Sequence, residues 1–127
     1  LLTLKDVMHS GTNTPIIGVT QTIKDALIEM SAKGLGMTAI VDNNQQLAGL
    51  FTDGDLRRVL EKNTSIKSLS IGEVMTKNCK SIEADKPAIV AFEVMDEHNL
   101  NSLPVVNAND KIVGAINMHT LMQAKIV

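Results

Sequence analysis

Apolar positions in the first third of the chain predict one amphipathic helix. The helical stripe has apolar residues spaced i, i+3, i+4 and i+7: Ile23, Ala26, Leu27 and Met30. Thr22 followed by Asp25 resembles a capping box with Asp in place of the usual Glu. Gly34 suits the left-handed residue that ends many helices. We therefore expect a helix that begins after Thr22 and ends near Gly34.

Strands and a second helix follow this stripe. Residues 37–41 and 46–51 are two apolar runs separated by the polar turn Asp42-Asn43-Asn44-Gln45, which is typical of a hairpin. A short apolar stretch at 15–17 precedes the first helix, and residues 54–62 read as the closing helix. The predicted order is strand, helix, strand, strand, helix.

The same order occurs twice. When the chain is shifted by 65 residues, residues 17–59 align with 82–124 without a gap, and the apolar pattern agrees. The second helical stripe contains Ala88, Ala91, Phe92 and Met95. A short Val-Met prelude, Val7-Met8 and Val74-Met75, precedes each copy at a slightly different offset. We place the two repeats at residues 1–63 and 64–127, which is an α+β architecture.

Prolines modify the second copy. Asp85 is a plausible N-cap for its first helix, and Pro87 is tolerated only in the first turn. Its hairpin strands are expected at 103–106 and 111–116, and its last helix at 119–125. Pro104 cannot donate to a ladder, so we expect it at a strand start or a sheet edge.

Composition excludes several classes of protein. The 127 residues contain two Phe and no Tyr or Trp, and the net charge is −2, so neither base stacking nor phosphate-backbone binding to nucleic acid is expected. No apolar run approaches a membrane span of about 18 residues. Cys79 is the single cysteine, which excludes an internal disulfide and fits a cytoplasmic protein. The three His residues lack metal-binding spacing, and no catalytic motif is evident, so we expect no metal site, no required cofactor and no enzymatic activity in this segment.

Residues 49–58 hold the richest chemistry, because a strand leads through a polar turn into a helix. The Thr52 hydroxyl and the helix N-terminus suit a phosphate, and the Asp55 carboxylate can accept two hydrogen bonds from a ribose diol. Arg57 or Arg58 could neutralise the phosphate. The plainer alternative is that Thr52 or Asp53 only caps the helix and the arginines are solvated.

The second copy of this segment is chemically weaker. Asn117 replaces Thr52 and Thr120 replaces Asp55, so the carboxylate is lost and two unequal sites are expected. A helix cap is the plainer role for Asn117. Gly34 and Gly36 precede the strand that starts at Met37, whose polarizable side chain could contact a base but is more often part of a core.

The repeated unit, with its Val-Met prelude and the run Gly-Leu-Phe-Thr-x-x-Asp-Leu-x-Arg, resembles the CBS domain, and two in tandem resemble a Bateman module. The resemblance covers nearly the whole chain. It implies two β-α-β-β-α units packed about a pseudo-twofold axis, which often dimerise further and bind adenosine nucleotides such as AMP, ADP or ATP. By this resemblance Thr52 meets phosphate and Asp55 meets ribose. The base would lie near Ile17, Met37, Thr38 and Ala39.

A narrower resemblance points to a parent enzyme. The runs 34–42 and 51–58 are similar to the C-terminal CBS pair of bacterial arabinose 5-phosphate isomerases. In that family a sugar isomerase (SIS) domain precedes the pair and interconverts ribulose 5-phosphate and arabinose 5-phosphate, and the product feeds Kdo and lipopolysaccharide synthesis. The chain starts at Leu1 without Met, which fits a regulatory piece of such a protein. The resemblance implies a ligand-sensing module for a nucleotide or a sugar nucleotide such as CMP-Kdo.

Two other readings remain open. The pair could mainly oligomerise its parent while its sites are vestigial, which the loss of the carboxylate at Thr120 favours. It could also belong to another nucleotide-metabolising enzyme or to an ion transporter. The sequence alone leaves undetermined the ligand, the sign of regulation, the number of occupied sites and the geometry of a dimer.

Overall fold

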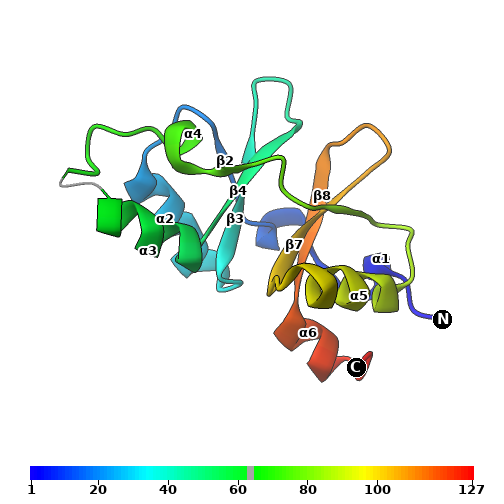
Figure 1. Ribbon diagram of the computed structural model, residues 1–127. Coiled ribbons are helices and arrows are strands. Elements are labelled where there is room, and N and C mark those ends of the chain that lie inside the picture. Colours follow the sequence, from blue (N-terminus) through cyan, green and yellow to red (C-terminus); the bar gives the residue numbers. More distant parts are fainter. Residues whose placement is uncertain (63–64) are drawn as a thin grey trace. The chain divides into compact units, whose positions relative to one another are not determined.

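The computed structural model describes residues 1–62 and 65–127 (Figure 1). The chain divides into two compact units: residues 15–79, and residues 1–14 together with 80–127. We call them the 15–79 unit and the 80–127 unit. The repeat boundary drawn between residues 63 and 64 lies outside the described residues. The boundaries of the compact units lie between residues 14 and 15 and between residues 79 and 80. The prelude of the first repeat packs in the 80–127 unit, and the prelude of the second repeat packs in the 15–79 unit.

The 15–79 unit is a four-stranded sheet with helices. Its elements in chain order are β2 (Ile16–Gly18), α2 (Ile23–Lys33), β3 (Met37–Val41), β4 (Leu47–Thr52), α3 (Asp53–Lys62), α4 (Ile71–Val74) and β5 (Thr76–Lys77). The strand order is β2-β3-β4-β5. β2 and β3 are parallel, and the other two pairs are antiparallel.

The 80–127 unit repeats this plan. Its elements in chain order are α1 (Leu4–Val7), β1 (His9–Ser10), the 3-10 turn η1 (Gly11–Asn13), β6 (Ile82–Glu83), α5 (Ala88–His98), β7 (Ser102–Val106), β8 (Ile112–Asn117) and α6 (Met118–Gln123). The strand order is β1-β8-β7-β6. The mixed α+β class is therefore as predicted. Each Val-Met pair joins a one-turn helix to a two-residue strand, and we call these two whole segments, residues 4–10 and 71–77, the preludes.

Close backbone approach fixes each prelude to its sheet. A Cβ on Gly49 of β4 would lie 2.6 Å from Met75 Sδ and 2.7 Å from the Thr76 carbonyl oxygen. A Cβ on Gly114 of β8 would lie 2.6 Å from the His9 carbonyl oxygen. Only glycine allows β5 and β1 to pair at these positions. The one-turn helices that precede them are anchored by the fully buried side chains of Ile71 and Leu4.

Each unit has its own hydrophobic cluster. In the 15–79 unit, buried side chains from the helices pack with Ile17, Ile40 and Phe51 of the sheet. In the 80–127 unit, Leu4 of the prelude packs with buried residues of α5, β7 and β8. Because buried apolar area is the main source of stability, a prelude that supplies a core residue is part of its unit's fold.

The helix predictions hold, with one correction. Thr22 and Asp25 form the predicted capping box of α2, and Gly34 ends that helix with φ of 72°. Asp85 is not the N-cap of α5. Pro87 occupies the N-cap position, with no side-chain hydrogen bond.

Pro104 was wrongly expected at a strand start or a sheet edge. It lies in the middle of β7, between β8 and β6. The equivalent residue Ala39 donates its backbone N–H to the Pro15 carbonyl at 2.9 Å. Pro104 has no N–H to donate, so the parallel ladder starts one residue later at Ile82↔Val105, and β6 is shorter than β2.

No helix within 1–62 or 65–127 combines the length and the hydropathy that a membrane crossing needs.

Candidate functional site

Asp55 is held at the start of α3 by Thr52, the last residue of β4. The Thr52 backbone N–H donates to Asp55 Oδ2 at 2.9 Å, and the Asp55 backbone N–H donates to Thr52 Oγ1 at 3.3 Å. This is the reciprocal arrangement of a capping box. The Thr52 hydroxyl also lies 3.1 Å from Asp55 Oδ2, to which it donates. The plainer role expected for Thr52, helix capping, is therefore present.

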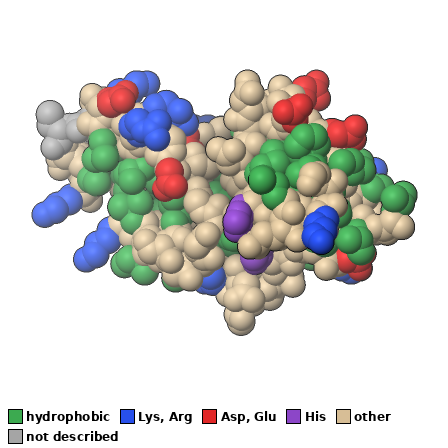
Figure 2. Space-filling model, turned by 90° about the horizontal axis from the view of Figure 1, so that it is seen from below, with side chains coloured by type: hydrophobic (Ala, Val, Ile, Leu, Met, Phe, Trp, Pro, Cys, Tyr) green, Lys and Arg blue, Asp and Glu red, His purple; other side chains and the backbone are tan. Residues whose placement is uncertain are grey.

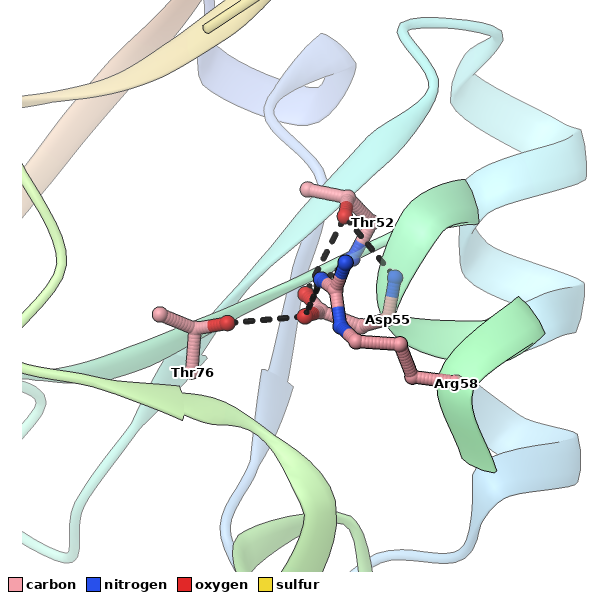
Figure 3. Close-up of polar contacts among 4 residues, drawn as sticks. All are labelled: Thr52, Asp55, Arg58 and Thr76. Atoms are coloured by element: carbon pink, nitrogen blue, oxygen red, sulfur yellow. Dashed lines mark hydrogen bonds and ion pairs between the residues drawn. The ribbon is translucent and has the colours of Figure 1, made fainter. Parts of the chain in front are cut away.

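The other oxygen of the same carboxylate has two further donors (Figure 3). Arg58 Nη2 donates to Asp55 Oδ1 at 2.6 Å, one turn along the helix. Thr76 Oγ1 of β5 donates to the same oxygen at 2.8 Å. The Asp55 side chain is 6% exposed and that of Arg58 is 61% exposed. The site therefore contains a buried carboxylate whose ion-pair partner lies in solvent.

Burial separates Asp55 from the other capping boxes of the chain. Within residues 1–62 and 65–127, three more boxes have the same Thr/Ser-x-x-acid pattern, at Thr3/Asp6, Thr22/Asp25 and Ser70/Glu73. Their acids are exposed or half-buried. In the Thr22 box, the pKa of Asp25 lies below the usual 3.8. The largest cause is the hydrogen bond from the Thr22 backbone, and the next is the hydrogen bond from the Thr22 side chain. The pattern itself therefore predicts a cap, and burial with two extra donors marks Asp55.

The sheet register divides the residues expected around a base between two faces. Met37 lies opposite Thr52 in the ladder, so Met37 and Ala39 share the Thr52 face. Thr38 lies opposite Phe51 and Ile17 opposite Ile40, on the face that packs against the helices. The side chain of Ile17 is part of that core and does not join Thr52.

The two arginines differ. Arg57 is exposed and is not among the donors to Asp55, whereas Arg58 is bound to it. The structure brings together Thr52, Asp55 and Arg58 from the predicted set, with Met37 beside Thr52. The bond from Thr76 was missed. Its only signal in the sequence was its position directly after the repeated Val-Met prelude.

A groove of about 540 Å³ extends from Asp55 between α3 and the segment that leads into β5. Its α3 wall carries Arg58, Val59 and Lys62, and its opposite wall carries Leu69, Glu73, Val74, Met75 and Thr76. This volume is within the range of small-molecule sites. The lining of the groove combines apolar side chains with charges of both signs.

The 80–127 unit has the corresponding positions with different chemistry. By the offsets of the repeat, Thr52, Asp55, Arg58 and Thr76 correspond to Asn117, Thr120, Gln123 and His9. Asn117 Oδ1 accepts from the Thr120 backbone N–H at 2.9 Å, so Asn117 caps α6. His9 Nε2 and Thr120 Oγ1 are 2.9 Å apart. The link from prelude to helix is kept, and the carboxylate is absent.

No cluster of three or more His, Cys, Asp or Glu side chains suited to a metal ion occurs among the described residues. Thr52, Asp55 and Arg58 place a hydroxyl, a carboxylate and a guanidinium together, which are groups that can recognise hydroxyl and anionic groups.

Comparison with known proteins assigns the family. The family model "CBS domain" matches residues 3–62 and 71–126. The chain belongs to the CBS domain family. Both matches follow the sequence repeats and include the preludes, so each repeat supplies a prelude to one compact unit and a hairpin to the other.

Relatives and solved structures agree with this tandem CBS pair. The chain is 42% identical over 127 residues to arabinose 5-phosphate isomerase KdsD of Pseudomonas aeruginosa, covering 100% of the chain and 39% of that relative. The CBS pair of protein MJ0100, in complex with methylthioadenosine and S-adenosylmethionine, has a TM-score of 0.87 at 22% identity, covering 98% and 96%. CBSX2 in complex with AMP has a TM-score of 0.81 at 23% identity, covering 99% and 97%. The structural matches establish the fold of the pair.

Proposed function

We propose that this CBS pair is the ligand-sensing module of a sugar-phosphate isomerase, of the arabinose 5-phosphate isomerase kind in Kdo and lipopolysaccharide synthesis. The chain spans about two fifths of the length of the relative that it matches, at 39%. We assign no catalytic residue to the chain and place catalysis in a preceding SIS domain of the parent protein. Binding would shift the activity of that domain by a coupling free energy of about 1–3 kcal/mol.

The observation that carries the proposal is the buried Asp55 carboxylate beside the start of α3. Burying a carboxylate is costly unless it is paired and hydrogen-bonded, and a helix cap does not require burial, because the acids of three other capping boxes among the described residues are exposed or half-buried. In the proposed complex Asp55 accepts the hydroxyls of a ribose, and Thr52 donates to a phosphate. The complexes of CBSX2 with AMP and of MJ0100 with methylthioadenosine and S-adenosylmethionine support an adenosine nucleotide as the first candidate.

Most of the remaining expected residues would contact different parts of the ligand, some through side chains and some through backbone atoms. Met37 and Ala39 share the Thr52 face and would contact the base through side chains. Thr38 and Ile17 would contribute only backbone atoms, because their side chains face the core of the 15–79 unit. Of the two arginines, Arg58 would neutralise the phosphate, whereas Arg57 is exposed, is not among the donors to Asp55 and would lie outside the site. Asn117 and Thr120 would form a second, weaker site, without a carboxylate for a diol.

Isothermal titration calorimetry with AMP, ADP, ATP and CMP-Kdo tests the proposal. We expect heat from at least one of them. D55A should lower that affinity about tenfold or more, because the diol loses its charged acceptor. D25A is the matched control, since it removes the acid of a capping box that lacks the groove. No heat from any ligand with a folded protein would overturn the nucleotide proposal, and an unchanged affinity of D55A would remove Asp55 from the site.

A second candidate is an oligomerisation module. Hydrophobic side chains reach the surface in both units: Ile28 and Leu60 on α2 and α3, and Ile89 and Met122 on α5 and α6. Figure 2 shows hydrophobic side chains among charged ones on the surface that it draws. Sedimentation velocity of the wild type and of L60K would discriminate. A homodimer lost in L60K, with no ligand response, would favour assembly over sensing.

The remaining assignments are proposals of the same kind. We propose a cytoplasmic location, no required cofactor and no nucleic-acid partner, which the single cysteine and the near-neutral charge support.

A further inference from the structure

The Asp55 carboxylate has no free acceptor position in this structure. A carboxylate offers about four lone-pair sites, two on each oxygen. Oδ2 accepts from the backbone N–H and the hydroxyl of Thr52, and Oδ1 accepts from Arg58 and Thr76. Each diol hydroxyl that bonds to Asp55 must therefore displace one donor that belongs to the protein itself.

We propose that Arg58 is the donor displaced and that it thereby determines specificity: the site selects a ligand that carries both a diol and an anionic group. This inference rests on the proposed nucleotide function and names the ligand class of the same site. It predicts that the site binds a nucleotide more tightly than the neutral nucleoside. Asp55 alone would not predict this difference in affinity, because both ligands carry the same diol.

Arg58 is the donor with the least structural constraint. The Thr52 N–H is fixed by the capping geometry. The single proton of the Thr52 hydroxyl, which also accepts from the Asp55 backbone, stays on Asp55 with a neutral diol and turns away only where a phosphate accepts it. Thr76 is held in β5, where it pairs with Leu50. The Arg58 side chain is 61% exposed, so its guanidinium can rotate away without a backbone movement.

Already in its bond to Asp55, the guanidinium lies at the start of α3, so a short rotation keeps it there. The position of a Cβ on Gly54 lies 3.6 and 3.7 Å from the two terminal nitrogens of Arg58, and 3.7 Å from Thr52 Oγ1. The guanidinium thus lies over the first turn of α3, beside the hydroxyl that would meet a phosphate. A helix start has unpaired N–H groups and positive potential.

Electrostatics then set the ligand class. A neutral diol that replaces Arg58 leaves the guanidinium unpaired beside a positive helix end. A diol with a phosphate supplies the anion that pairs with the released guanidinium. Planar guanidinium groups bind phosphate well, often through two parallel hydrogen bonds.

The experiment compares AMP with adenosine by calorimetry in the wild type, R58Q and R57Q. In the wild type we expect AMP to bind about tenfold or more tightly than adenosine. In R58Q adenosine should bind about threefold more tightly than to the wild type, because its competitor for Asp55 is gone, and the preference for AMP should fall below about threefold. R57Q removes a neighbouring exposed arginine that is not bound to Asp55, and it should keep the wild-type ratio.

Each other outcome has a definite meaning. Binding with the same AMP-to-adenosine ratio in the wild type and R58Q would overturn the role of Arg58 and leave the nucleotide proposal intact. An equal loss of AMP preference in R57Q and R58Q would show that Arg58 acts only through its positive charge at the surface, and would overturn its specific role. Absence of binding in all three proteins would overturn the nucleotide proposal itself.

A second measurement follows Arg58 directly. The side-chain Nε–H signal of Arg58 in a 15N spectrum should shift on addition of adenosine toward its position in D55N, since both changes break the same ion pair. A signal that stays at its ligand-free position while adenosine binds would contradict the displacement.

Discussion

Thr76 Oγ1 donates to Asp55 Oδ1 at 2.8 Å, across 21 positions of the sequence. His9 and Thr120 are the equivalent pair of the 80–127 unit, with Nε2 and Oγ1 2.9 Å apart. In both units a prelude is thus tied to the helix that follows the hairpin. The candidate site around Asp55 is therefore built jointly by β4, α3 and the exchanged prelude.

The first prediction concerns this bond. T76V keeps the shape of the side chain and removes the hydroxyl, so the buried carboxylate loses one donor. We expect the free energy of unfolding to fall by about 1–3 kcal/mol, as for hydrogen bonds to charged groups. Urea unfolding followed by circular dichroism measures it. T20V, at an exposed threonine of the same unit, is the control, and an equal midpoint for the two variants would contradict the prediction.

The second prediction concerns the close approach of β5 to β4. In G49A the new methyl group would overlap Met75 Sδ and the Thr76 carbonyl, at 2.6 and 2.7 Å. Overpacking of this kind costs about 1–3 kcal/mol. We also expect faster hydrogen exchange at the amides of β5.

G18A provides the matched control for G49A. A Cβ at Gly18 meets only Gln21 Oε1, at 3.7 Å, which is an ordinary contact. G18A should unfold near the wild-type urea concentration. Equal stability of G49A and G18A would show that the prelude does not depend on this contact.

The sequence predicted the elements of this fold better than their partners. The 3.6-residue stripe that ends at Met30 and the alternation around the turn at 42–45 are local signals, and α2 and the β3–β4 hairpin follow them. The repeat identified two preludes but carried no information on which sheet each one joins. That choice depends on buried contacts such as Leu4 and Ile71, far apart in sequence from their partners.

The site was predictable in part for the same reason. Thr52 and Asp55 were found because a capping box is a pattern of four consecutive residues. Thr76 was missed because its bond to Asp55 depends on the exchange of preludes. Ile17 was wrongly grouped with Met37. Side chains alternate between the two faces of a sheet, and the face on which Ile17 lies depends on the register of β2 with β3, which the sequence leaves open.

The third prediction is a pH dependence from the α2 capping box. Hydrogen bonds from Thr22 lower the pKa of Asp25 in the folded protein below 3.8. A lowered folded-state pKa stabilises the protein above the unfolded-state pKa, and this contribution is lost as pH falls through the folded-state pKa. Stability should therefore decline below about pH 4, and less steeply in D25N than in the wild type.

Urea midpoints measured between about pH 6 and pH 2 test this, with T22A as a second variant that removes the side-chain donor. T22A should also show a shallower decline. The same slope in all three proteins would exclude the Asp25 box as a source of acid sensitivity.

The last prediction transfers the site between the units. The 80–127 unit has His9, Asn117, Thr120 and Gln123 at the positions of Thr76, Thr52, Asp55 and Arg58. The four-fold variant H9T/N117T/T120D/Q123R supplies the carboxylate and its donors on a backbone that keeps the same cap and prelude link. If the proposed nucleotide function holds, the calorimetric stoichiometry of tight AMP binding should rise from about one to about two per chain, because the weaker site of the second unit gains a diol acceptor. The three-fold variant that retains Thr120 lacks the carboxylate and should stay at about one. A folded four-fold variant that still binds a single AMP would mean that these four side chains are insufficient to define the site.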